Sequence, residues 1–156
     1  FNSIKKGKID TFLVYYSNLG PWSNLPEQCD GIPSVWVLWI KNKECFARKL
    51  FCDSTSNTTI SISSVPFDFF ISHFKDFELR DKYIEKIKKE QKFFPPIPTD
   101  GSWEYLYFMT SKSRYYLNLS EHHRIDKIWK QFPWIKPTID AVDTTIFELN
   151  RNKNVR

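Results

Sequence analysis

The side chains of this sequence that are most able to bind another molecule lie on a predicted β-hairpin. Residues 103–109 and 114–119 alternate with period two, and residues 110–113 supply the turn. A two-residue loop inside this turn and a four-residue loop over it give the same register, in which Met109 lies opposite Arg114. One face of the hairpin then carries aromatic rings with polar tips, an arginine and an amide: Trp103, Tyr105, Tyr107, Arg114, Tyr116 and Asn118. Because Tyr, Trp and Arg supply most hot spots of protein interfaces, this face is our first candidate binding surface.

Three interpretations of this polar aromatic face stay open. It contacts another protein, it stacks nucleobases as the sheet of a single-strand binder does, or a helix simply covers it. In the nucleic-acid alternative Lys112 and Arg114 contact phosphates, but the glycine-containing sheet motif of RNA binders is missing, and Glu104 and Glu121 lie nearby. We therefore favour a protein partner, with the chain acting as a small inhibitor or immunity-type protein, and keep single-stranded nucleic acid as the alternative.

A further aromatic candidate, Trp22, lies in a long segment between two predicted strands. Residues 17–33 contain two of the four glycines and three prolines, which is typical of a loop. A tryptophan there either packs the loop onto the core or anchors a partner, and we include Trp22 among the candidate binding residues.

The histidines and carboxylates form no recognisable catalytic or metal-binding pattern. His122 and His123 occupy the first turn of a predicted helix, where the helix dipole disfavours protonation, and adjacent helical residues do not face one another. His73 lies beside a stripe of phenylalanines, and Asp140 and Asp143 are typical of a solvated helix face. The motifs HExxH and GxSxG do not occur. We expect a non-enzymatic protein without a metal ion or cofactor, and a small hydrolase with an unrecognised site stays as the third alternative.

Glycine usage bears on nucleotide chemistry. The chain has only 4 glycines in 156 residues, and neither GxGxxG nor GxxxxGK(S/T) occurs. Loops that cradle phosphates need several glycines for close backbone approach, so the sequence argues against nucleotide enzymes of the Rossmann or P-loop type.

The three cysteines cannot all be paired. On one continuous strand, Cys45 and Cys52 would be about 23 Å apart and would point to opposite faces, so they could not form a disulfide with each other. Cys29 lies in the long loop and could reach either one. We expect three unpaired thiols, with a bond to Cys29 left open.

The hairpin is expected to join other strands in one sheet. Residues 10–16 read as a strand that is apolar or amphipathic on both faces, which favours a central position. Residues 34–51 form a second hairpin that pairs Trp39 with Phe46 and Leu38 with Ala47, although its Asn42–Lys43 turn lacks the preferred glycine. A short strand over 58–63 follows, with Ile60 and Ile62 facing inward.

Apolar spacing predicts helices in three places. The first begins at Pro66, with Ser64 as its cap, and its pattern falters at Arg80 and Asp81, so it is one kinked helix or two. A second begins after Ser120 and ends at Pro133. Its apolar residues follow helical spacing and are Ile125, Ile128, Trp129 and Phe132. The third covers 137–150, where a helix is favoured over a strand because proline suits a helix start.

These elements predict an α+β fold with a mostly antiparallel sheet built from two hairpins plus flanking strands, and two to three amphipathic helices packed on one face. The length of 156 residues suits a single domain, with 1–9 and 151–156 peripheral. Net charge of +5 permits an acidic protein partner or nucleic acid, and no apolar run is long enough to span a membrane. We expect a cytoplasmic protein, with export open because the sequence begins at Phe1, and the composition leaves the oligomeric state open.

Overall fold

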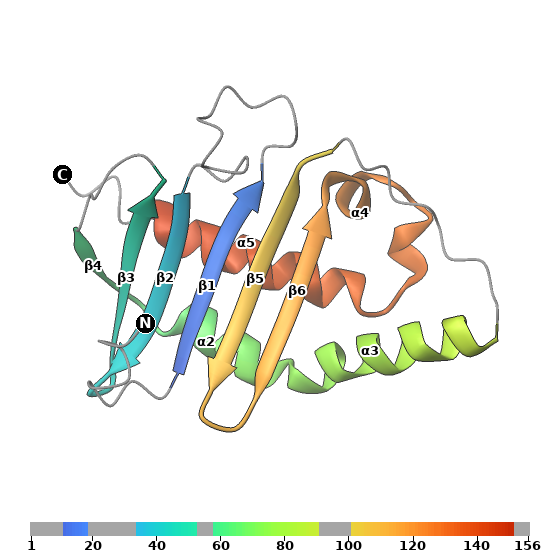
Figure 1. The fold of residues 1–156 in the computed structure, drawn as a ribbon, viewed down its shortest axis with the longest axis horizontal. Helices are drawn as coiled ribbons and strands as arrows, with labels where there is room; N and C mark the ends of the chain where they lie inside the picture. Colours follow the sequence, from blue (N-terminus) through green and yellow to red (C-terminus); the bar gives the residue numbers. More distant parts are fainter. Residues whose placement is uncertain (1–10, 19–33, 53–57, 91–100, 152–156) are drawn as a thin grey trace.

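The computed structural model describes residues 11–18, 34–52, 58–90 and 101–151, which form one antiparallel sheet with helices beside it (Figure 1). The sheet has six strands in the order β4-β3-β2-β1-β5-β6, so β1 is central, as its two apolar faces predict. The strands are β1 Thr11–Asn18, β2 Ser34–Lys41, β3 Glu44–Phe51, β4 Thr59–Ile62, β5 Trp103–Thr110 and β6 Arg114–Ser120. The predicted α+β class, with its two hairpins and flanking strands, is confirmed.

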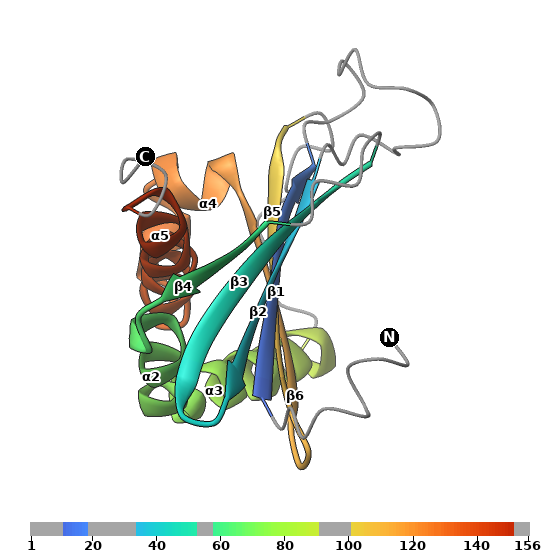
Figure 2. The same ribbon diagram turned by 90° about the vertical axis from the view of Figure 1, so that its left-hand side faces the viewer.

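The helical segments follow the strands in two groups. They are α2 Val65–Ser72, α3 Phe74–Lys89, α4 Glu121–Ile125, the short 3-10 helix η2 Trp129–Gln131 and α5 Ile135–Arg151. Figure 2 shows α2, α4 and α5 against one face of the sheet, and Figure 1 shows α3 running on past the edge strand β6. In the described part of the chain, none of these helices is long and apolar enough to cross a membrane.

The β5–β6 hairpin has the predicted register. Met109 pairs with Arg114 and Tyr107 with Tyr116, and the turn closes through a hydrogen bond from Thr110 N to Ser113 O of 2.9 Å. The register therefore follows from the turn position and the two-residue alternation alone.

The β2–β3 hairpin also has the predicted register, although its turn requires a left-handed backbone conformation at residues other than glycine. Trp39 pairs with Phe46, and the two turn residues both have positive φ, 52° at Asn42 and 68° at Lys43. Lysine in this conformation costs about 1 kcal/mol relative to glycine. The pairing of β2 with β3 along their whole length offsets this cost, so the turn forms without glycine.

Three helix predictions need correction. The break between α2 and α3 lies at His73 and not at Arg80 and Asp81, because α3 continues without interruption to Lys89. Ser64 precedes α2, but its hydroxyl donates to the Asp68 carboxylate, 2.6 Å away, and does not cap the helix backbone.

The helix expected between Ser120 and Pro133 is two short pieces, α4 and η2. Ser120 is the N-cap residue as predicted, but α4 ends at Ile125, so the helical spacing beyond it is lost. Ile125 and Ile128 are consequently exposed, whereas Trp129 and Phe132 are buried. The last segment is the predicted helix, and α5 begins two residues earlier than Pro137, at Ile135.

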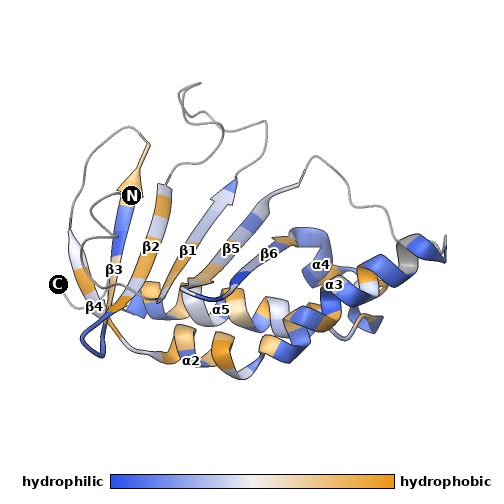
Figure 3. Ribbon diagram, turned by 60° about the horizontal axis from the view of Figure 1, so that its bottom comes forward, coloured by the Kyte–Doolittle hydropathy of each residue, from blue (hydrophilic) through white to orange (hydrophobic). Residues whose placement is uncertain are grey.

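The core lies between one sheet face and α2, α3 and α5. Alternate residues of the strands are fully or almost fully buried there, namely Leu13, Leu38, Ala47, Leu106, Phe108, Leu117 and Leu119. Phe70 of α2 stacks on Phe108 at a centroid distance of 4.6 Å, and Phe74 of α3 stacks on Tyr115 at 4.8 Å. Figure 3 shows why the two helices differ: α2 is mainly hydrophobic, and the part of α3 beyond the sheet is mainly hydrophilic.

Candidate binding surface on the open sheet face

The sheet face opposite the core is formed by the other alternate residues of each strand. The registers place these residues in three rows that run across the strands. From β6 to β4, the first row is Arg114, Met109, Phe12, Trp39, Phe46 and Ser61. The second row, over the same strands, is Tyr116, Tyr107, Val14, Val37, Arg48 and Thr59. The third row ends at β3 and is Asn118, Tyr105, Tyr16, Val35 and Leu50. None of the described helices lies over this face, which we call the open face (Figure 2).

The β1, β5 and β6 end of the open face is a series of stacked rings. Tyr16 stacks on Tyr105 with ring centroids 4.7 Å apart, and Tyr107 packs against Tyr116 at 4.6 Å. Longer contacts of 6.1 to 6.4 Å join Tyr105 to Tyr116 and to Trp103. We call these five residues the tyrosine ladder. Cross-strand aromatic pairs of this kind stabilise a sheet modestly and leave the polar tips at the surface.

Three hydroxyls of the ladder, those of Tyr16, Tyr105 and Tyr116, have raised pKa values. Burial among neighbouring rings raises the pKa of Tyr116 to about 12, and burial is also the main reason that the pKa values of Tyr16 and Tyr105 are raised. The hydroxyl oxygens of Tyr16 and Tyr107 lie 3.5 Å apart. Each protonated hydroxyl can donate and accept a hydrogen bond, so the ladder presents neutral polar groups beside apolar ring surface.

Arg80 of α3 reaches the edge of the open face from the helical side. Its guanidinium donates to the backbone oxygen of Tyr116 at 2.7 Å and to Oδ1 of Asn118 at 2.6 Å. It also lies 5.6 Å from the ring centroid of Trp134. These bonds occupy an outward-facing carbonyl of the edge strand and orient the Asn118 amide, which limits strand addition at this edge.

The structure brings most of the predicted binding residues together. Trp103, Tyr105, Tyr107, Arg114, Tyr116 and Asn118 all lie on the open face. Tyr116 is 41% exposed, so the expected alternative that a helix covers this face is wrong for the described helices. Trp22 lies outside the described residues.

The sequence analysis missed the part of the surface that other strands contribute. Tyr16 belongs to the ladder because β1 pairs with β5, with Tyr16 opposite Tyr105. The row of Phe12, Trp39 and Phe46 extends the apolar surface as far as β3, and Trp39 stacks on Phe46 at 5.8 Å. The alternation within residues 10–16 indicated which of their side chains share a face, but no local pattern indicated their neighbours.

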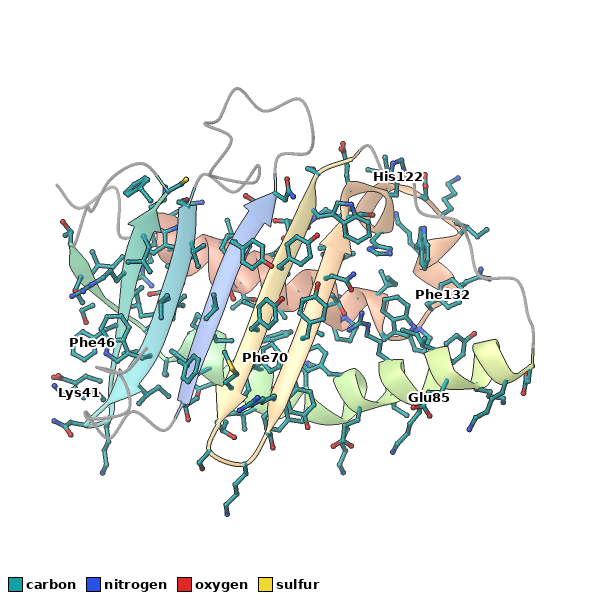
Figure 4. All side chains as sticks on the ribbon, in the orientation of Figure 1. Lys41, Phe46, Phe70, Glu85, His122 and Phe132 are labelled. Carbon is teal, nitrogen blue, oxygen red and sulfur yellow. The ribbon has the colours of Figure 1, made fainter. Side chains whose placement is uncertain are left out.

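A second aromatic cluster surrounds His123 of α4. His123 is 2% exposed and meets Trp129 edge to face with ring centroids 4.5 Å apart. Trp103 and Trp134 contact the same imidazole at 6.1 and 6.2 Å. We call these four residues the histidine cluster. Figure 4 shows its neighbours His122 and Phe132 at the opposite side of the molecule from Phe46 of the open face.

The imidazole of His123 is neutral because its surroundings disfavour the charged form. Its Nδ1 accepts a hydrogen bond of 3.0 Å from the backbone N–H of Ser120, which places the proton on Nε2. Burial is the largest cause that lowers the pKa of His123 to about 4, and the charges of Arg80 and His122 lower it further. We predicted disfavoured protonation from the helix dipole, but desolvation by the aromatic rings is the main cause.

Arg124 and His73 both have polar partners within the fold. Arg124 of α4 donates to Oε2 of Glu104, with its Nη2 at 2.8 Å, and pairs with Asp143 of α5 at 2.7 Å. His73 is bonded to the backbone oxygen of Phe69 at 2.9 Å. The described residues contain no group of three or more His, Cys, Asp or Glu placed to hold a metal ion.

The cysteines differ from our expectation of three unpaired thiols. Cys45 is free and buried, and burial is the largest cause that raises the pKa of its thiol. Cys52 is disulfide-bonded. Cys45 and Cys52 are therefore not bonded to each other, as the strand geometry predicts.

Comparison with known proteins finds no family model, no curated protein and no solved structure that matches this chain. Function has to be inferred from the chemistry of the open face and of the histidine cluster.

Proposed function

We propose that this chain is a non-enzymatic binding protein that contacts another protein through the open face. The observation that carries this proposal is the apolar and aromatic surface of the three rows, over which no described helix lies. An antiparallel sheet with one solvated face normally carries polar side chains on that face. A large apolar face that is partly exposed on such a sheet is typical of an interaction site.

The dimensions of the open face suit a protein partner. Five strands of 7 or 8 residues, each about 25 Å long, at a spacing of about 4.8 Å give a surface of roughly 600 Å². This approaches the roughly 800 Å² that each partner contributes to a standard protein interface. A surface of this extent can cover part of another protein, which supports an inhibitor or immunity-type role.

Stacking within the ladder favours protein over single-stranded nucleic acid. Sheets that bind single strands present ring faces on which bases stack. Here the rings of Tyr16 and Tyr105 lie 4.7 Å apart and nearly parallel, at 20°, so those faces are already used by each other. The rows also contain only Arg48 and Arg114 as cations, too few for a continuous phosphate track.

A site-specific photo-crosslinker tests the proposal. The residue p-benzoylphenylalanine replaces Tyr107 on the open face or, as a control, Leu79, which is exposed on α3. The protein carrying the crosslinker is irradiated in a lysate with and without an excess of unlabelled protein. We expect a discrete protease-sensitive adduct from position 107 only, and we expect wild-type protein to abolish it by competition.

The matched competitor is the double variant Tyr107→Thr, Tyr116→Thr, which places a residue of high strand preference at each position. We expect this variant to compete at least tenfold less well than the wild type. A nuclease-sensitive adduct would favour the nucleic-acid alternative, and equal competition by the variant would contradict binding through the open face.

The disulfide bond of Cys52 supports an oxidising compartment as the place of this binding, because such bonds are rare in the cytosol. Thiol titration of the unfolded chain tests this: we expect one reactive thiol before reduction and 3 after it, in line with the three cysteines of the sequence. Three thiols before reduction, in protein isolated with thiols blocked at lysis, would contradict it.

A further inference from the structure

The charges of the open face indicate which chemistry its partner has. Among the residues of the three rows, the charged side chains are Arg114 on β6 and Arg48 on β3, and no carboxylate occurs. In the next row toward the β2–β3 turn, Lys41 lies opposite Glu44, and these two opposite charges offset each other. The open face is therefore positive at two places and neutral between them.

The described part of the fold does not neutralise either arginine. Arg48 donates through Nε and Nη2 to the Thr59 hydroxyl, at 3.1 and 2.8 Å, which orients the guanidinium without cancelling its charge. Arg114 is exposed, and the ion pairs found among the described residues involve neither arginine. By contrast, Arg124 on the helical side has both Glu104 and Asp143.

The two arginines flank the apolar part of the face. Arg114 and Arg48 are separated by four strand spacings, or about 19 Å across the sheet. Between them lie Met109, Phe12 and Trp39 in one row, and Tyr107, Val14 and Val37 in the next. A partner complementary to this pattern has apolar groups at the centre and a carboxylate near each side.

We propose that the partner segment is acidic at its two ends and apolar or aromatic between them, with the carboxylates paired to Arg48 and Arg114. This inference rests on the proposed function, since it names the chemistry of the partner at the same face. A second copy of this chain does not fit, because its own open face would bring arginines and no carboxylate from these rows. An extended segment of about six residues spans the distance between the two arginines.

The test is a selection from a displayed library of random peptides about 12 residues long, long enough to span both arginines. The baits are the wild type, the variant Arg48→Glu, Arg114→Glu and the control Lys75→Glu, Lys130→Glu. The control makes the same change of charge at two exposed lysines of α3 and η2. We expect wild type and control to enrich Asp and Glu on both sides of apolar residues, and the arginine variant to enrich Lys and Arg instead.

A selected acidic peptide is then measured against each variant. We expect Arg48→Glu and Arg114→Glu singly to weaken its binding by about three- to tenfold, as for an exposed ion pair that is reversed. Peptides that need Tyr107 and Tyr116 but show no acidic bias would overturn the charge inference and leave the proposed function standing. Peptides whose binding is unchanged in the Tyr107→Thr, Tyr116→Thr variant would overturn binding through the open face itself.

Discussion

The tyrosine ladder and the histidine cluster use similar aromatic side chains for opposite purposes. In the ladder the rings lie nearly parallel at a surface, with Tyr116 41% exposed, and their hydroxyls remain at the solvent boundary. In the cluster the rings meet edge to face around His123, with Trp129 and Trp134 almost fully buried. Trp103 belongs to both groups, through its contacts with Tyr105 and with His123.

The difference shows that aromatic content alone does not identify a binding surface. Buried rings contribute mainly to the free energy of unfolding, because each removes a large apolar area from water. Half-exposed rings on an open sheet contribute less to stability and remain available to a partner. If this division is correct, substitutions in the two regions should separate stability from binding.

The largest effect is expected at Trp129. The variant Trp129→Ala removes a ring that is 1% exposed and packs on His123, Phe132 and Trp134. We expect a loss of about 3–5 kcal/mol in the free energy of unfolding, measured by urea denaturation. Tyr116→Ala is the matched control and should cost about 1 kcal/mol. Equal losses of unfolding free energy at the two positions would contradict the proposed division between a stabilising cluster and a binding ladder.

The next effect is a dependence of stability on pH that comes from His123. Its pKa is about 4 in the folded protein against 6.5 for an ordinary histidine, so between these values the unfolded chain binds more protons. Stability from this group is fully present above about pH 6.5 and is lost as the pH falls toward 4, by about 3 kcal/mol in total.

Denaturation of the wild type and of His123→Gln at pH 7 and pH 4.5 measures this contribution. The variant should lose less stability on acidification than the wild type. An unchanged pH dependence in His123→Gln would show that the imidazole is not held neutral by burial.

A smaller effect is expected at Arg80, which joins the two regions. Lysine keeps the charge but cannot make both the bond to Tyr116 O and the bond to Asn118 while lying over the Trp134 ring. We expect Arg80→Lys to cost about 1–2 kcal/mol of unfolding free energy. Arg114→Lys, on the open face, is the control and should leave stability unchanged. A cost at Arg114 as large as that at Arg80 would argue against this role.

Local patterns predicted some of this architecture and missed the rest for identifiable reasons. The Tyr107–Tyr116 pairing was predictable because a short turn fixes the register of its own hairpin. The Tyr16–Tyr105 pairing was not, because β1 and β5 are separated by more than 80 residues and no local signal selects which strands pair. The ladder therefore could be found only in part.

The helix error has a similar cause. Arg80 and Asp81 interrupt the apolar spacing of the segment, which indicated a break there, yet α3 continues through both. Arg80 lies at the β6 edge, where its polar contacts take the place of apolar packing. A charge within an apolar stripe can thus indicate a tertiary contact of the helix, and the sequence alone does not name the contact.

The smallest effect on stability, and the largest on binding, is expected from the variant Tyr107→Thr, Tyr116→Thr. Threonine keeps the preference for a strand, and the two residues lose only one cross-strand aromatic pair and part of their contact with Tyr16 and Tyr105. We expect a change of about 1 kcal/mol or less in unfolding free energy and retention of the far-ultraviolet circular dichroism spectrum. Binding of the peptides selected on the wild type should fall at least tenfold, whereas Leu79→Thr on α3 should leave it unchanged. If the double variant lost as much unfolding free energy as Trp129→Ala, the ladder rings would contribute mainly to stability, and this would contradict the proposed division between the two regions.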